Sequence, residues 1–386
     1  MKPASTRGLR FVHLYLENWR NFAQVDVGLA SRVFLVGPNA SGKSNLLDVF
    51  RFLHDIVKIG GGFQEAVRRR HGISNIRCLA ARRYPDIVVR VSLGKEPGVA
   101  VWKYELRFTQ DNLRRPIIKK EKVTSQQGVI LDRPDKEDRE DSERLTQTYL
   151  EQVNVNRSFR EVAELFGSVR YLHIVPQLVR NPARSAGLRN DPYGGDFLEQ
   201  VARTPEKTQK ARLRRIRDAL SVAVPQLQEL ELWKDDRGVP HLRGKYEHWQ
   251  PQGKWQTEDE FSDGTIRLLG LLWATLDGTG PLLLEEPELS LHSDVVGLLP
   301  QMFARMQRRT GRQVMLSTHS QEILRDEGLG TDELLLLLPE KEGTVVRPAN
   351  TFRQIRELLK GGVSLADAAL PRTRPENVEQ LALFGE

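Results

Sequence analysis

The stretch Val33-Phe34-Leu35-Val36-Gly37-Pro38-Asn39-Ala40-Ser41-Gly42-Lys43-Ser44 decides how the chain is expected to fold. Its first four residues are a continuous apolar run, which predicts a strand buried on both faces. The next eight match the phosphate-binding pattern G-x-x-x-x-G-K-[ST]. Apolar residues at helical spacing then predict a helix over residues 43–55. A strand, a glycine-containing loop and a helix in this order predict a nucleotide-binding P-loop.

The residue types of this loop suit a nucleoside triphosphate. Its glycines let the backbone wrap around phosphate with the amides pointing inward, and the helix that follows adds its N-terminal dipole. Lys43 is expected to reach the β- and γ-phosphates, with a part in catalysis, and Ser44 to bind Mg²⁺. ATP and Mg²⁺ are therefore the predicted cofactors. The loop residues expected to contact the nucleotide are Gly37, Pro38, Asn39, Ala40, Ser41, Gly42, Lys43, Ser44 and Asn45.

Two further apolar strands end in ionisable side chains. Leu282-Leu283-Leu284 runs into Glu285 and Glu286, and Val314-Met315-Leu316 runs into Ser317-Thr318-His319. Ligands bind beyond the carboxyl ends of strands in open α/β sheets. Glu285 is thus expected to hold the water shell of Mg²⁺, and Glu286 to orient and deprotonate an attacking water. His319 is expected to contact the γ-phosphate or that water, although a lone histidine is more often structural.

The segment Phe261-Ser262-Asp263-Gly264-Thr265 precedes a strongly apolar stretch, residues 266–274. Ser262 is a natural helix N-cap, and capping alone could explain it. A helix start of this kind can also aim its amides at a phosphate held by another subunit. Ser262, Asp263 and Gly264 are therefore candidate nucleotide contacts made across a dimer interface.

The four motifs in this order resemble the ABC-type ATPase heads of the SMC/RecF/OLD group. The resemblance covers residues 11–338 and is strongest to compact bacterial ATPases of the AAA-21 type, which accompany partner effectors in phage-defence islands. It implies an α/β fold: a P-loop NTPase of ABC-ATPase type, with a mixed central sheet, an antiparallel β lobe and a helical insertion. The family pattern usually has Asp where this chain has Glu285, whose side chain is longer.

The resemblance also implies roles for residues outside the four motifs. The segment Leu16-Glu17-Asn18-Trp19-Arg20-Asn21-Phe22 is similar to the family's first hairpin, whose Arg and Asn lie near the nucleotide, so Arg20 and Asn21 are candidate contacts. Gln177 is the candidate glutamine-loop residue, with contacts to nucleotide and metal, and Gln64 is the lesser candidate. Ser290-Leu291-His292 would be the loop that crosses to the other head.

Length and patterning suggest four segments. These are an N-terminal ATPase lobe (residues 1–85), a β-meander and helical insertion lobe (86–225), a C-terminal ATPase lobe (226–345), and a C-terminal helix with a polar tail (346–386). The sequence contains no sustained heptad repeat, so the long coiled coil of SMC proteins is not expected. Too little chain follows His319 for the TOPRIM nuclease domain of OLD proteins, so any nuclease is expected from a partner.

Local patterns give further expectations. Residues 10–16 and 25–29 predict a hairpin, and period-two alternation over 86–132 predicts an antiparallel meander. Residues 133–144 are almost all charged and are expected to be exposed, without core, while 145–166 are expected to be helical. Residues 197–224 predict one or two helices broken at Pro205, and 227–256 predict hairpins.

Charge and cysteine usage bound the function. The net charge of +7 is modest for 386 residues but uneven. Two basic runs are either solvated faces or tracks for a polyanion such as double-stranded DNA. A single cysteine, Cys78, excludes an intrachain disulfide, and no apolar stretch is long enough to span a bilayer or serve as a signal peptide. A cytoplasmic protein with no membrane partner is expected. The basic runs are Arg68, Arg69, Arg70, Arg77, Arg82 and Arg83, and Arg203, Lys207, Lys210, Arg212, Arg214, Arg215 and Arg217.

Three functions compete at this point. The first is an ATP-hydrolysing switch that closes as a head-to-head homodimer, or a higher even-numbered oligomer, and gates an effector protein or DNA in anti-phage defence. The second is a nucleotide-sensing scaffold with negligible turnover, which the glutamate at position 285 slightly favours. The third is the motor subunit of a membrane transporter, which the signature segment and the Glu-Glu-Pro-Glu strand disfavour.

Overall fold

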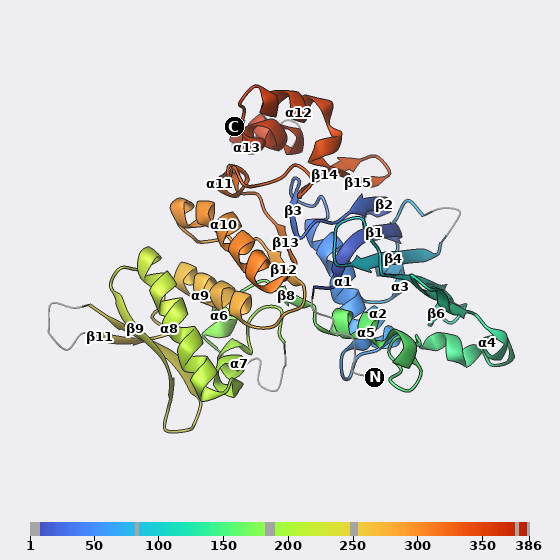
Figure 1. Cartoon of the computed structure of the whole chain (residues 1–386), viewed down its shortest axis with the longest axis horizontal. Helices are drawn as coiled ribbons and strands as arrows, with labels where there is room; N and C mark the ends of the chain where they lie inside the picture. Colours follow the sequence, from blue (N-terminus) through green and yellow to red (C-terminus); the bar gives the residue numbers. More distant parts are fainter. Residues whose placement is uncertain (1–7, 82–84, 182–189, 248–253, 375–377, 384–386) are drawn as a thin grey trace. The chain divides into compact units, whose positions relative to one another are not determined.

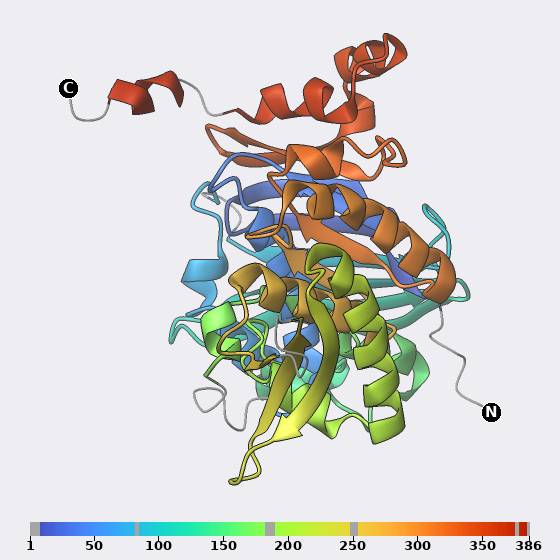
Figure 2. The ribbon, with the colours of Figure 1, turned by 90° about the vertical axis from the view of Figure 1, so that its left-hand side faces the viewer.

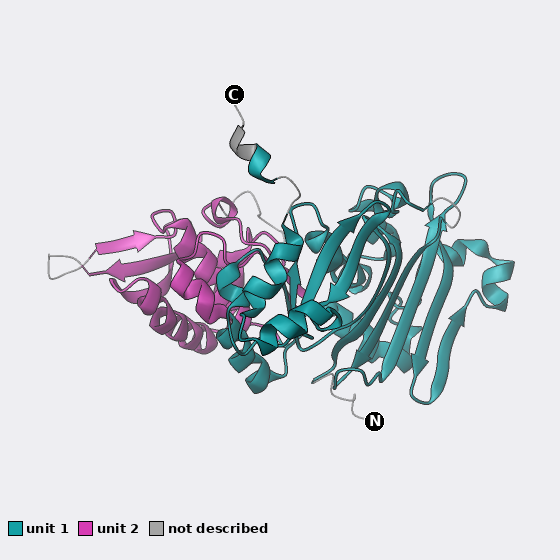
Figure 3. Cartoon of the chain, turned by 90° about the horizontal axis from the view of Figure 1, so that it is seen from above, with its two compact units in different colours: residues 1–169, 279–281, 300–386 teal, residues 170–278, 282–299 magenta. Residues whose placement is uncertain are grey.

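The computed structural model describes residues 8–81, 85–181, 190–247, 254–374 and 378–383. The chain forms two compact units (Figure 3). Unit 1 holds residues 1–169, 279–281 and 300–386, and unit 2 holds residues 170–278 and 282–299. Neither unit coincides with one of the four segments expected from the sequence, because the chain leaves unit 1 after residue 169 and returns to it later.

A wholly antiparallel sheet forms the β lobe of unit 1, with the order β2-β1-β4-β5-β6-β7 (Figure 1). The predicted N-terminal hairpin and the predicted meander are both confirmed. They share one sheet because β4 pairs with β1, with Tyr15 opposite Arg90. The bounds are β1 (Arg10–Trp19), β2 (Phe22–Gly28), β4 (Ile87–Gly94), β5 (Trp102–Gln110), β6 (Pro116–Ser125) and β7 (Gly128–Arg133).

A mixed sheet in unit 1 carries the P-loop. Strand β3 (Arg32–Val36) lies between β13 (Val314–Ser317) and β14 (Leu334–Glu340) and is parallel to both, while β15 (Gly343–Pro348) is antiparallel to β14. Helix α1 (Lys43–Val57) follows the loop and ends two residues beyond the predicted end. Its apolar face packs on the β lobe, where the rings of Phe50 and Phe11 lie 4.7 Å apart. The predicted order of strand, loop and helix is confirmed.

The expected helix over residues 145–166 is wrong for most of its length. Only α5 (Arg160–Gly167) is α-helical there, after 3-10 turns at Ser142–Thr146 and Asn156–Phe159. The amides of Tyr149 and Leu150 instead donate to the carboxylate of Glu121, at 2.8 and 3.1 Å. Such side-chain acceptors compete with helical hydrogen bonds. The other unit 1 helices are α2 (Phe63–Arg68), α3 (Ile73–Ile76), α4 (Lys136–Glu140), α11 (Gln321–Leu324), α12 (Arg353–Lys360) and α13 (Leu365–Ala369).

The charged segment over residues 133–144 is also not wholly exposed, contrary to expectation. The side chains of Arg133 and Asp138 are fully buried together with that of Glu121. Arg133 Nη1 donates to Glu121 at 3.1 Å, and its Nε and Nη2 donate to Asp138 at 2.8 and 2.6 Å. Burial is tolerated because each charge has a hydrogen-bonded partner.

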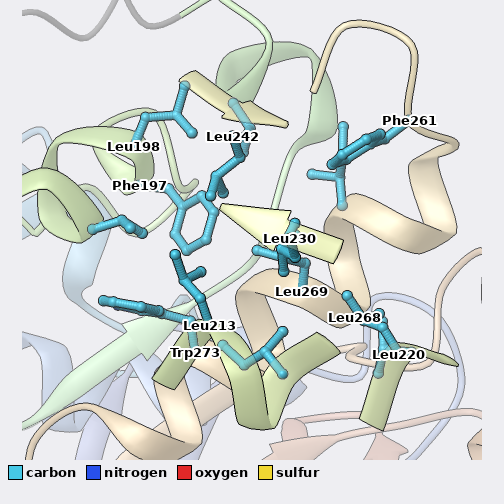
Figure 4. Close-up of a cluster of buried hydrophobic side chains, with 14 of the residues drawn as sticks. Phe197, Leu198, Leu213, Leu220, Leu230, Leu242, Phe261, Leu268, Leu269 and Trp273 are labelled. Atoms are coloured by element: carbon cyan, nitrogen blue, oxygen red, sulfur yellow. The ribbon is translucent and has the colours of Figure 1, made fainter. Parts of the chain in front are cut away.

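Unit 2 combines a parallel strand pair, a helical cluster and a small antiparallel sheet of order β11-β10-β9. Helix α8 lies along that sheet (Figures 1 and 2), and Phe197, Leu213, Leu230, Leu269 and Trp273 belong to the apolar core (Figure 4). The predicted break at Pro205 and the predicted hairpin strands are confirmed. The bounds are β8 (Arg170–Leu172), α6 (Pro176–Val179), α7 (Phe197–Arg203), α8 (Glu206–Ala223), β9 (Leu227–Lys234), β10 (Pro240–Tyr246), β11 (Lys254–Thr257), α9 (Asp263–Leu276) and β12 (Leu282–Glu285).

Helix α10 (Ser293–Thr310) begins in unit 2 and contains Pro300, at which unit 1 resumes. It connects the strand that ends in Glu285 to the strand that precedes His319. No helix within the described ranges is both long and apolar enough to cross a membrane.

Candidate nucleotide-binding site

The P-loop has a backbone shape that only its own residue types permit. Gly42 is left-handed, with φ of 95°, and a Cβ there would lie 2.2 Å from Nδ2 of Asn21. A Cβ on Gly37 would lie 2.7 Å from the carbonyl oxygen of Leu337 in β14. Gly42 therefore requires glycine for both conformation and space, and Gly37 requires it for space. The loop packs tightly against its neighbours while it turns into α1.

Lys43 folds back over this loop. Its side chain is only 7% exposed, and Nζ donates to the carbonyls of Gly37 at 3.1 Å and Pro38 at 3.2 Å. The hydroxyl of Ser41 is buried and has no hydrogen-bond partner among the described residues. An ammonium group, an unsatisfied hydroxyl and the start of a helix thus meet at one loop, and all three favour an anion.

Arg20 and Asn21 lie beside the loop, in the turn between β1 and β2. Asn21 Nδ2 donates to the carbonyl of Ser41 at 2.8 Å, and Asn45 Nδ2 donates to Asn21 Oδ1 at 2.9 Å. Arg20 is left-handed, with φ of 53°, and its guanidinium lies 3.8 Å from Asp48 on α1. Burial lowers the pKa of Arg20, against the opposing effect of Asp48. The turn therefore holds both side chains against the first turns of α1.

His319 follows the strand next to the one that leads into the P-loop. The amide of Thr318 donates to the carbonyl of Leu35 at 3.0 Å, so the carboxyl ends of β13 and β3 are in register. Thr318 is fully buried, whereas the side chain of His319 is exposed. Unit 1 thus brings the P-loop and His319 to the same edge of its mixed sheet.

The paired carboxylates belong to unit 2. Glu285 is the last residue of β12, and Glu286 turns left-handed, with φ of 43°. Such a φ is uncommon for a non-glycine residue and often marks a functional site. The hydroxyl of Tyr171, on the neighbouring strand β8, donates to Glu285 Oε2. His173 Nδ1 lies 3.2 Å from the carbonyl oxygen of Glu285. The pairing of β12 with β8 therefore fixes the position of Glu285 at the end of its strand.

The signature segment starts α9 in unit 2. Ser262 is its N-cap, with Oγ accepting from the amide of Thr265 at 3.1 Å, as the sequence predicts. Arg180 fastens the segment, since Nη1 lies 2.7 Å from Asp263. A Cβ on Gly264 would lie 2.4 Å from the carbonyl oxygen of Ser290. The signature segment and the loop Ser290-Leu291-His292 therefore touch within one unit.

The two candidate glutamines have different surroundings. Gln177 is exposed in α6, a short helix that follows β8. Gln64 Nε2 donates to the backbone carbonyls of Pro116 at 2.9 Å and Thr146 at 2.8 Å, so this side chain ties loops of the β lobe together. Gln177 thus stays the candidate with an available amide.

Ser44 and Glu285 supply a hydroxyl and a carboxylate, the hard oxygen donors that Mg²⁺ prefers. In the part of the chain that the structure describes, no group of three His, Cys, Asp or Glu side chains is placed to hold a metal ion. Mg²⁺ at nucleotide sites commonly takes one or two protein oxygens, with waters and phosphates completing its shell. The donor chemistry of this chain fits that pattern.

The structure divides the basic runs into buried and accessible residues. Arg70 is only 4% exposed and pairs with Asp48 at 2.7 Å and Asp55 at 3.1 Å, so it cannot track a polyanion. Arg212 pairs with Asp277 at 2.9 Å. Arg82 and Arg83 lie outside the described residues. The α8 basic face comprises the exposed residues Lys207, Lys210, Arg214 and Arg215.

Sequence reasoning missed Tyr171 and Arg180, which hold Glu285 and the signature segment, and Thr344, whose hydroxyl accepts from Asn21 at 2.8 Å. Each acts through a pairing between segments far apart in the chain. No spacing rule joins such residues, so nothing in the local sequence pattern marks them.

Comparisons with known proteins identify the family and the fold of the chain. The AAA_21 family, described as "AAA domain, putative AbiEii toxin, Type IV TA system", matches residues 32–325. The chain is similar to an SMC head bound to the C-terminal winged-helix domain of ScpA, with 13% identity, a TM-score of 0.54, and coverage of 88% of this chain and 97% of that one. An SMC head from Pyrococcus furiosus with an extended coiled coil, bound to the C-terminal domain of ScpA, gives 11% identity and a TM-score of 0.52, covering 91% and 100%. No curated protein sequence matches. The shared fold is the SMC-head P-loop fold predicted from the sequence.

Proposed function

Because the chain belongs to the AAA_21 family and has the fold of an SMC head, we propose that it is an ATP-hydrolysing switch that acts in the cytoplasm. In this proposal two copies close head to head around two ATP molecules, and hydrolysis reopens them. The cycle gates a partner effector, a nuclease supplied in trans being one candidate, and contributes to anti-phage defence. Association into a higher even-numbered oligomer is compatible with the same cycle.

The observation that carries the proposal is the arrangement of polar groups at the P-loop. Lys43 Nζ lies over the loop, 3.1 Å from the carbonyl of Gly37, and the buried hydroxyl of Ser41 lacks a partner among the described residues. A triphosphate would give Lys43 charged acceptors in place of neutral carbonyls, and charge-assisted hydrogen bonds are stronger. Packing against Asn21 and Leu337 explains the requirement for glycine at positions 42 and 37, but it does not explain the unsatisfied hydroxyl of Ser41.

The chemical step assigns one role to each side chain. Lys43 offsets charge on the β- and γ-phosphates. Glu286 accepts a proton from the attacking water while the oxygen of that water bonds to the γ-phosphorus and the bond between the γ-phosphorus and the ADP oxygen breaks. His319 contacts the γ-phosphate or that water. Mg²⁺, when bound, supplies Lewis-acid neutralisation of the phosphates. Ser44 and Glu285 would hold it, with Gln177 contacting its water shell.

Dimer closure is supported by the exposed start of α9. Ser262 is exposed and caps a helix of 14 residues, whose N-terminus attracts an anion such as the γ-phosphate held by a second copy. Asp263 and Gly264 complete that contact, and the exposed residues of Ser290-Leu291-His292 would cross to the other head. Both segments belong to unit 2 and touch, so they can be presented together.

Partner binding is supported by the two solved relatives, because both SMC heads are bound to a ScpA domain. For DNA, the α8 basic face offers exposed cations on one helix. Such a face would bind duplex DNA through its phosphates, without sequence preference.

The second candidate is a nucleotide-sensing scaffold that binds ATP with negligible turnover. The observation that favours it is Glu285, which stands where the family usually has Asp and whose carboxylate accepts from Tyr171. A carboxylate held in this way would coordinate water around the metal less freely.

A turnover assay on the purified chain separates the two candidates. ATP binding is measured by calorimetric titration and phosphate release by a coupled assay, with Lys43→Ala as the background control. Turnover above that control supports the switch, whereas tight binding with turnover equal to the control supports the scaffold. Wild-type protein that binds no ATP would refute both.

A further inference from the structure

Asn21 joins three segments that are distant in the sequence. Its Nδ2 donates to the carbonyl of Ser41 in the P-loop and to the hydroxyl of Thr344 in β15, both at 2.8 Å. Its Oδ1 accepts from Asn45 Nδ2, in the first turn of α1, at 2.9 Å. Trp19 Nε1 donates to the carbonyl of Asn45 at 2.9 Å and closes the network on the side of β1.

The network sets one orientation for the Asn21 amide. An amide group has two N–H donors and one carbonyl oxygen. Here one N–H faces Ser41, the other faces Thr344, and the oxygen faces the donor of Asn45. A flipped amide would set its oxygen against the carbonyl of Ser41 and its N–H groups against those of Asn45, so these two partners favour the observed orientation, and the Thr344 hydroxyl then accepts.

The β14–β15 hairpin packs directly against the turn between β1 and β2 that contains Asn21. The amide of Thr344 donates to the backbone carbonyl of Asn21 at 2.7 Å, and Thr344 is only 5% exposed. A Cβ on Gly343 would lie 2.6 Å from that same carbonyl oxygen. In β14, Leu337 lies against Gly37 at the other end of the loop. The hairpin therefore contacts the P-loop directly at its start and through Asn21 at its end.

We propose that Thr344 is a positioning residue for nucleotide binding: it holds Asn21, and through Asn21 the P-loop, in the phosphate-binding shape before the nucleotide arrives. The inference rests on the proposed function of the P-loop. Its physical basis is preorganisation, because a loop that is already ordered loses less conformational freedom when the ligand binds. Loss of the buried Thr344 hydroxyl leaves one N–H of the half-buried Asn21 without its acceptor and weakens the restraint on the carbonyl of Ser41.

The test compares Thr344→Val, which removes the hydroxyl, with Thr344→Ser, which keeps it. Thr109→Val makes the matched change at a buried threonine of β5 that lies outside the network. Hydrogen exchange of residues 37–45 is measured without nucleotide, and ATP affinity by titration with Mg²⁺. Thr344→Val is expected to exchange faster in the loop and to bind ATP about tenfold more weakly, equivalent to roughly 1.4 kcal/mol. Thr344→Ser and Thr109→Val should match the wild type.

Unchanged loop exchange and unchanged ATP affinity in Thr344→Val would overturn the proposal, as would equal losses in Thr344→Val and Thr344→Ser. Thr344→Ala removes the same hydroxyl and carries the same expectation if valine prevents folding. Wild-type protein that binds no nucleotide would refute the proposed function alone, because loop exchange in the nucleotide-free variants still reports whether Thr344 orders the loop.

Discussion

Replacing Arg133 by methionine should destabilise unit 1 strongly, because this guanidinium is the cation of a fully buried network. Its Nε and Nη2 donate to Asp138 at 2.8 and 2.6 Å, and its Nη1 donates to Glu121 at 3.1 Å. Backbone carbonyls of Gln147 and Arg144 accept from the same group at 3.0 and 2.9 Å. All three charged side chains are 0% exposed, so water cannot replace the lost partner.

The expected loss follows from what is left behind. Methionine fills part of the volume but leaves Glu121 without its cation, and removing one partner of a buried ion pair lowers the free energy of unfolding by about 3–5 kcal/mol. Arg115→Met is the matched control, because Arg115 pairs with Asp111 and Glu143 at the surface, with 48% of its side chain exposed. Exposed pairs contribute little, so the control should stay close to the wild type.

Urea unfolding followed by circular dichroism at neutral pH measures both variants. An Arg133→Met midpoint that falls no further than the Arg115→Met midpoint would refute the reasoning and would favour the exposed segment expected from the sequence.

Acid titration adds a second readout. Burial raises the pKa of Asp138, but hydrogen bonds from Arg133 and the Asp135 amide, together with the Arg133 charge, outweigh it and lower that pKa to about 2 from 3.8. A lowered pKa stabilises the folded state above about pH 3.8, and this stability is lost as the pH falls toward 2. The acid-dependent loss should be smaller in Arg133→Met, because the main partner of Asp138 is gone.

Four further predictions concern the proposed function. Lys43→Ala should abolish ATP binding, with about 1.5–3 kcal/mol lost for each charge-assisted hydrogen bond, and wild-type affinity in a calorimetric titration would contradict the P-loop assignment. Glu286→Gln should keep ATP binding and lower turnover by about 10²–10⁴-fold while trapping the dimer, so that wild-type turnover would place the base elsewhere, with His319 the next residue to test. Ser262→Arg should block ATP-dependent association, measured by sedimentation, without weakening ATP binding by the monomer. The control is Ser262→Ala, which loses the same N-cap, worth about 1 kcal/mol, and association of Ser262→Arg equal to that of Ser262→Ala would show that the segment is only a helix cap. Charge reversal of the α8 basic face to glutamate should weaken duplex DNA binding and flatten its salt dependence at unchanged basal turnover, and DNA affinity equal to the parent would identify these cations as solvated surface.

Much of the fold followed from short-range pattern. The apolar run before Gly37, the helical spacing after Lys43, the period-two meander and the break at Pro205 each describe neighbours in the sequence, and each element formed as predicted. The N-cap at Ser262 belongs to the same class, because its acceptor and donor are three residues apart. Local geometry suffices for such features.

Burial of charge could not be predicted in this way. Residues 133–144 were expected to be exposed, and the run from Arg68 was expected to be either a solvated face or a track for a polyanion. Arg133 and Arg70 are nevertheless buried, because carboxylates from other elements pair with them. A charged residue is buried only where a partner offsets desolvation, and that partner, Glu121 or Asp48, stands well outside the local pattern. The helix expected over residues 145–166 was wrong for the same reason, since the amides of Tyr149 and Leu150 donate to the distant Glu121.

The sequence by itself therefore determined which residues form the P-loop, since that loop is one continuous segment whose glycines, lysine and serine have set spacing. Only the tertiary structure decided what holds the loop in shape. Asn21, in the first hairpin, bonds to Ser41 of the loop, and Thr344, in the β14–β15 hairpin, bonds to Asn21, at sequence separations of 20 and 323 residues. Hydrogen bonds between such segments depend on strand pairing across the whole unit, which no local spacing encodes.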